Sequence, residues 1–113
     1  MRAIGYQTPL PIENPASLQD IDLPKPVPSG RDLLVEIRAV SVNPVDTKVR
    51  RSATPDVGEW RVLGWDAAGI VVGTGPDVTD FSVGDEVFYA GAINRPGTNA
   101  EFHLVDERIV GRK

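Results

Sequence analysis

Hydrophobic and polar residues alternate most regularly between residues 32 and 42. Successive side chains of a strand point to opposite faces, so the apolar set that begins at Leu33 shares one face, while Glu36 and Arg38 lie on the other. We therefore predict a half-buried β-strand over this segment.

Shorter stretches with the composition of strands lie on both sides of this segment. They cover residues 1–7, 18–23, 69–73, 86–90, 100–105 and 109–110. Proline lacks a backbone N–H, so Pro9 and Pro11 end the first stretch, which we predict to be an edge strand. Glycine and proline between the stretches are typical of tight turns.

One helical signal follows the long strand. Asn43 is a good N-cap, the proline after it is favoured at the first helical position, and Asp46 places a negative charge in the first turn. We predict a short helical turn over residues 45–50 and a loop over residues 51–59.

These elements predict the fold class. About six short strands, one helical turn and no strand–helix–strand alternation favour a mainly β fold, a partly open barrel, over a doubly wound sheet. A chain of 113 residues fits one domain with a modest core.

Composition removes several classes of function. Cysteine is absent, which excludes disulfides, thiolate zinc ligands and cysteine nucleophiles. The single histidine, His103, has no nucleophile or second histidine beside it and is interpreted as structural. A net charge of −4 opposes nucleic-acid binding, and no apolar run is long enough to cross a bilayer. We expect a cytoplasmic protein without nucleic-acid or membrane partners.

Three motifs carry most of the functional information. They are Ser-Val-Asn-Pro-Val-Asp-Thr at residues 41–47, Leu-Gly-Trp-Asp-Ala-Ala-Gly at residues 63–69 and Val-Thr-Asp-Phe-Ser-Val-Gly-Asp-Glu-Val at residues 78–87. In this order they resemble the N-terminal, GroES-like domain of zinc-free medium-chain dehydrogenases/reductases of the quinone oxidoreductase-like or zinc-type alcohol dehydrogenase-like family. The resemblance covers nearly all of residues 1–113 and implies a GroES-like, partly open β-barrel with short helical turns.

The resemblance also implies site residues. Asn43 is expected to donate a hydrogen bond to the substrate carbonyl as hydride arrives, and Lys48 replaces a tyrosine of many relatives as the second catalytic residue. Asn43 and Lys48 are also the two residues expected to contact the cofactor. Asp46, Gly64 and Trp65 are expected to line the substrate pocket. Trp65 stands where zinc-dependent relatives have a histidine ligand, and an indole N–H only donates, so no catalytic zinc is expected.

The cofactor and partners follow from the same resemblance. It implies NADPH, a small-molecule quinone or activated carbonyl substrate such as an enone, and a homodimer of the full-length protein. NADPH would be bound mainly by a C-terminal Rossmann domain. The segment Gly73-Thr74-Gly75 is not a dinucleotide-binding motif, because Pro76 and Asp77 follow it where a helix would have to begin. We expect residues 1–113 to be the N-terminal domain of a longer reductase, missing its Rossmann domain and inactive alone.

Other interpretations stay open at this point. Asn43 and Asp46 are explained equally by capping of the helical turn, and Trp65 by packing in the core. A binding or assembly module like the cochaperonins, without enzymatic activity, would share the barrel fold. However, residues 69–75 are β-branched and glycine-flanked, whereas a mobile loop is expected to be polar.

Overall fold

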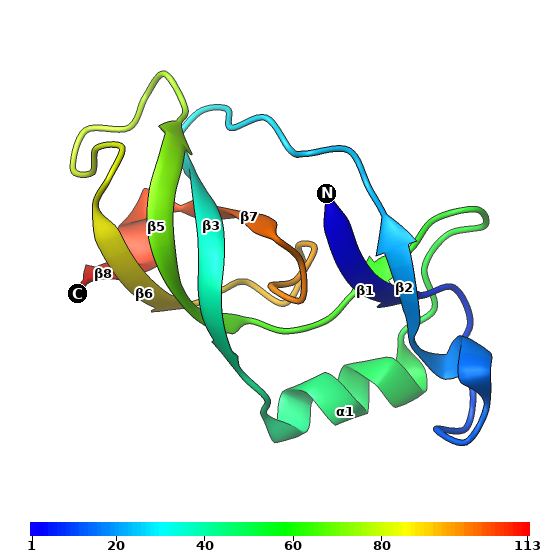
Figure 1. The fold of residues 1–113 in the computed structure, drawn as a ribbon. Coiled ribbons are helices and arrows are strands. Elements are labelled where there is room, and N and C mark those ends of the chain that lie inside the picture. Colours follow the sequence, from blue (N-terminus) through cyan, green and yellow to red (C-terminus); the bar gives the residue numbers. More distant parts are fainter.

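The computed structural model describes residues 1–113 as eight β-strands, one α-helix and two short 3-10 helices. The strands are β1 (Arg2–Tyr6), β2 (Gln19–Asp22), β3 (Asp32–Ser41), β4 (Arg61–Val62), β5 (Asp66–Thr74), β6 (Glu86–Ala90), β7 (Phe102–Asp106) and β8 (Val110–Arg112). The α-helix is α1 (Pro44–Ser52), and the 3-10 helices are η1 (Pro15–Ser17) and η2 (Glu107–Ile109). The strands form two sheets, which confirms the mainly β, partly open fold (Figure 1).

The larger sheet has five antiparallel strands in the order β7-β3-β5-β6-β8. β3 lies between β5 and β7, and the apolar face predicted for it points into the core. This core contains seven buried residues, namely Leu33, Val35, Ala67, Val71, Val87, Tyr89 and Val105. The predicted half-buried strand is therefore confirmed, with its end at residue 41.

The smaller sheet has three strands in the order β2-β1-β4 and packs beside α1. Figure 1 shows α1 running beneath these strands, directly after the end of β3. Tyr6 fixes the helix to β1, because its hydroxyl donates to the carbonyl of Ala53 at 2.7 Å and lies 3.1 Å from that of Val49. The core here is small and consists of Tyr6, Leu63 and Trp65.

Two local predictions were wrong. β1 is the central strand of its sheet and not an edge strand, because β4, which the sequence did not indicate, pairs with its far side. The helix is also longer than the predicted turn and continues to Ser52. The Tyr6 hydroxyl meets the carbonyls at its C-terminal end, so a distant residue stabilises the last turn.

The N-terminal strand joins the smaller sheet to the segment before β7. The backbone N–H of Ile4 donates to the carbonyl of Asn99 at 2.9 Å, and the N–H of Glu101 donates to the carbonyl of Arg2 at 3.0 Å. Between these two bonds, Ala3 forms an antiparallel β-bridge with Ala100. The two sheets are thus joined here as well as through β3 and α1.

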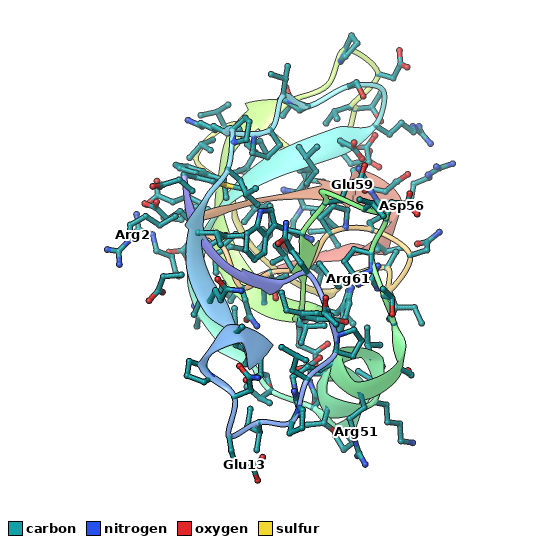
Figure 2. The ribbon with its side chains drawn as sticks, turned by 90° about the vertical axis from the view of Figure 1, so that its right-hand side faces the viewer. Arg2, Glu13, Arg51, Asp56, Glu59 and Arg61 are labelled. Carbon is teal, nitrogen blue, oxygen red and sulfur yellow. The ribbon has the colours of Figure 1, made fainter.

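Charged side chains are spread over the surface. Arg2, Arg51 and Arg61 lie in different parts of Figure 2 and do not gather into one basic patch. No helix has the length and apolar composition that a membrane crossing requires.

Candidate functional site

The candidate site begins where β3 ends. Asn43 follows the strand with extended backbone (φ −128°, ψ 162°) and occupies the N-cap position of α1, as the sequence predicted. Asn43 and Asp46 form a capping box at the start of the helix, in which the Asn43 side chain faces the backbone N–H of Asp46 and the Asp46 carboxylate faces that of Asn43. A cap uses the side-chain oxygen, so the Asn43 amino group remains available for a different partner.

The Asn43 amide points to the first residue of β5. Nδ2 donates to a carboxylate oxygen of Asp66 at 2.7 Å, and a second, longer contact of 3.4 Å joins Nδ2 to the carbonyl of Ser41. Ser41 and Asp66 are also direct partners in the β3–β5 ladder. The sheet register therefore places the first and second motifs side by side.

Asp46 holds the backbone of Asn43. Its Oδ2 accepts from the Asn43 N–H at 3.0 Å, which is the capping contact expected of an acidic residue in the first helical turn. The Asp46 side chain is only 6% exposed, and its Oδ1 has no hydrogen-bond partner. The structure thus gives Asp46 a capping role, and its place in a substrate pocket stays a prediction.

Gly64 and Trp65, both in the second motif, are buried. Gly64 has φ +94°, and a Cβ there would approach Thr98 Oγ1 at 2.6 Å, so glycine is required for conformation and for space. Trp65 is 3% exposed and packs with Tyr6 and Leu63. In these 113 residues its ring is part of the core, and a contact with substrate stays a prediction.

Lys48 is separated from Asn43 by its position on the helix. The side chain is exposed and takes part in no ion pair. The structure does not bring the Lys48 ammonium into contact with the Asn43 amide. Its catalytic and cofactor-binding roles stay predictions.

An apolar groove of about 410 Å³ lies next to the Asn43–Asp66 pair, on the ends of three neighbouring strands. It is lined by Ala39, Val40, Ser41, Asp66, Ala67, Ala68, Phe88, Tyr89 and Ala90. Sequence reasoning missed both this groove and Asp66. A signal was present, since Asp66 directly follows Trp65 in the second motif and opposes the end of the long strand.

The buried histidine is part of the core of the larger sheet. Tyr89 Oη lies 2.8 Å from His103 Nδ1, and His103 Nε2 lies 3.0 Å from the carbonyl of Pro96. A neutral ring satisfies both contacts by accepting at Nδ1 and donating at Nε2. Burial lowers the pKa of His103 to about 4 and raises the pKa of Tyr89 above its ordinary value. These features agree with a structural histidine.

The donor groups do not fit a zinc site. No cluster of three or more His, Cys, Asp or Glu side chains occurs in the chain, and the indole at position 65 is buried and cannot ligate a metal. The chain also has no glycine-rich turn between a parallel strand and a helix that could hold a pyrophosphate, because all its strand pairs are antiparallel.

Comparison with known families decides the relationship. Residues 29–112 match the alcohol dehydrogenase GroES-like domain. The chain belongs to this family. The GroES-like domain is one part of longer proteins, and this chain spans about a third of the length of the relatives that it matches. The recognition of an N-terminal oxidoreductase domain from its motifs is thus confirmed.

Three proteins are similar to this GroES-like domain in sequence or in structure. A zinc-type alcohol dehydrogenase-like protein of Staphylococcus aureus is 46% identical over 112 residues, which are 99% of this chain and 33% of the relative. A Rhizobium etli protein assigned to the zinc-dependent alcohol dehydrogenases has 71% identity and a TM-score of 0.96 over 100% of this chain and 33% of its own. Escherichia coli quinone oxidoreductase, solved with NADPH, has 26% identity and a TM-score of 0.84 over 99% of this chain and 33% of its own.

Proposed function

We propose that this GroES-like domain is the substrate-binding part of an NADPH-dependent oxidoreductase that reduces a quinone or an activated carbonyl compound without zinc. The observation that carries the proposal is the Asn43 amide, whose amino group is held at the end of β3 by Asp66 and is not used in capping α1. Family membership supports the oxidoreductase class, and the E. coli relative supports quinone and NADPH.

In the proposed reaction the Asn43 side chain acts as a fixed hydrogen-bond donor. An amide N–H aimed at the acceptor oxygen stabilises the negative charge that develops there during reduction. When bound, the nicotinamide supplies the hydride. The apolar groove beside Asp66 offers a surface for the hydrophobic part of a quinone or enone.

The remaining roles are assigned by the resemblance. Lys48, as an exposed cation, would contact the cofactor or the developing charge, and Asp46, Gly64 and Trp65 would border the substrate. A C-terminal Rossmann domain would bind most of the NADPH. We further propose that the full-length protein is a cytoplasmic homodimer.

The zinc-free part of the proposal rests on donor chemistry, although two of the relatives carry zinc in their names. Trp65 and the absence of cysteine leave no ligand set that suits a catalytic zinc. Metal analysis of protein purified without chelator should find well under one zinc per chain. A tightly held, stoichiometric zinc would refute this part.

The dependence on a second domain can be tested with the chain itself. Because the pyrophosphate-binding turn is missing, the 113-residue chain should not oxidise NADPH with any quinone. Saturable oxidation of NADPH by the purified chain would show that the cofactor site lies within these residues.

The role of Asn43 is tested in the full-length enzyme. Asn43→Ala should lower kcat/KM by roughly ten- to a thousandfold, the range for losing one oxyanion-type donor, with NADPH affinity little changed. If Asn43 only ends the strand and starts the helix, the same change should cost about 1 kcal/mol of stability and leave the chemistry nearly intact.

Asn43→Ser serves as the matched control. Serine still suits the N-cap position, but its shorter side chain should reach an acceptor oxygen poorly. The Ser variant should therefore keep its stability and lose activity. A Ser variant with both full stability and full activity would remove Asn43 from the catalytic site.

A further inference from the structure

The carboxylate of Asp66 determines which way the Asn43 amide faces. Nδ2 lies 2.7 Å from Asp66 Oδ2, a short distance typical of a hydrogen bond to an ionised acceptor. With the amide rotated by 180°, its oxygen would face the carboxylate and the two would repel each other. The charge of Asp66 thus selects one of the two orientations of the amide.

The positions of both residues are fixed by the backbone. Asp66 is the first residue of β5 and pairs with Ser41 of β3, two residues before Asn43. Asp46 binds the Asn43 backbone N–H at 3.0 Å from the other side. Two carboxylates therefore hold Asn43, one at its backbone and one at its side chain.

This arrangement leaves one amide proton for a ligand. An asparagine amino group has two N–H donors, and Asp66 takes one of them. The contact of the amino group with Ser41 is 3.4 Å long, so it competes weakly with a better acceptor. The second N–H is therefore available to the oxygen of an incoming substrate.

We propose that Asp66 is the positioning residue of the site: its carboxylate orients the Asn43 amide so that the second N–H is presented to the acceptor oxygen. This inference rests on the proposed function. Asp66 acts through Asn43 and does not itself touch the reacting atoms. Its effect on catalysis should therefore vanish when Asn43 is absent.

A double-mutant cycle in the full-length enzyme tests this dependence. Asp66→Ala should lower kcat roughly tenfold, with the KM for NADPH little changed, and should lower it no further in the Asn43→Ala background. Asp66→Glu, which keeps the carboxylate, should recover part of the loss. Glu36→Ala is the matched control, because Glu36 is a carboxylate on β3 that pairs with Arg38 at the surface, and it should leave kcat unchanged.

The amide itself can be observed by NMR in the 15N-labelled chain. One Nδ2 proton of Asn43 should resonate at low field and exchange more slowly than those of the exposed Asn94. Both features should be lost in Asp66→Ala and partly kept in Asp66→Glu. Amide resonances that do not respond to Asp66→Ala would overturn the proposal.

The kinetic outcomes distinguish an error in the role of Asp66 from an error in the role of Asn43. If Asn43→Ala lowers kcat but Asp66→Ala does not, or lowers it equally in both backgrounds, Asp66 does not act through Asn43 and the inference is wrong. If Asn43→Ala leaves kcat intact while, in the chain that keeps Asn43, the amide resonances respond to Asp66→Ala, the proposed function is wrong and the Asn43–Asp66 contact is structural only.

Discussion

The two sheets differ in how completely their buried groups are satisfied. In the larger sheet His103 bonds to Tyr89, and beside the sheet the carboxylate of Glu107 on η2 accepts from the backbone N–H groups of Thr79 and Asp80. In and around the smaller sheet four buried polar atoms have no partner. They are Asp46 Oδ1, Arg61 Nε, Trp65 Nε1 and Thr98 Oγ1.

The sizes of the two cores follow the same division. Seven buried residues form the core of the larger sheet, and three form the core between the smaller sheet and α1. The larger sheet therefore supplies the rigid support, while the smaller sheet and helix have fewer stabilising contacts. Asn43 lies between them and has one anchor in each region, Asp66 on β5 and Asp46 on α1.

The largest expected effect is in the larger sheet, at Gly69. A Cβ at this position would collide with the backbone carbonyl of Glu36 on the neighbouring strand and lie 2.6 Å from Val35 Cγ1. Gly69→Ala should cost about 3 kcal/mol or more of unfolding free energy, measured by urea denaturation. Gly73→Ala is the control in the same strand, because its Cβ would have a nearest neighbour at 3.4 Å. Equal stability of the two variants would contradict the picture of a tightly packed support.

Acid should weaken the larger sheet next. The pKa of His103 is lowered from 6.5 to about 4, so between these pH values the unfolded chain binds a proton that the folded chain excludes. The stabilising contribution is complete above pH 6.5 and is lost as the pH falls toward 4, by roughly 3 kcal/mol. Urea denaturation as a function of pH measures this loss. His103→Gln should flatten the curve in this window; an unchanged curve would assign the acid sensitivity to another group.

A smaller effect is expected where Tyr6 holds α1. Tyr6→Phe removes the hydroxyl that donates to Ala53 and should cost about 1 kcal/mol. Hydrogen exchange should accelerate in α1 and remain slow in β3 and β5. Tyr89→Phe, the matching change in the larger sheet, should leave α1 exchange unaltered. Faster exchange in both regions for either variant would mean that the two regions open together.

The smallest effect should have the opposite sign. Thr98 is fully buried and its hydroxyl has no partner, so Thr98→Val should be neutral or stabilise the chain by up to about 1 kcal/mol. Thermal unfolding is sufficient to measure it. Destabilisation by more than about 1 kcal/mol would show that the hydroxyl binds a buried water.

The sequence predicted those parts of the fold that depend on local pattern. The strand over residues 32–42 was recognised from alternation and the start of α1 from Asn43 and the proline after it, and both are present. β4 was missed because two residues carry no periodic pattern and are extended only through pairing with β1. The length of α1 was underestimated because its last turn is held by Tyr6.

The candidate site was predicted only in part, for a similar reason. Asn43 was chosen from its motif, but Asp66, its actual partner, is distant in sequence and is brought near by the β3–β5 register. Trp65 was considered both as a pocket wall and as a core residue, and only its contacts with Tyr6 and Leu63 place it in the core. Side-chain partners that depend on register are not visible in one sequence.

The pairing of β1 with residues 99–101 has a consequence for the order of folding. On one side, the first residues of β1 have partners that lie far along the chain, since Ile4 bonds to Asn99 and Ala3 bridges to Ala100. Closing such a long loop delays these contacts relative to local ones. On this side residues 2–4 of β1 therefore stay unpaired until residues 99–101 have left the ribosome, and they are open to association with other chains during synthesis, whereas residues 5 and 6 pair earlier with β4.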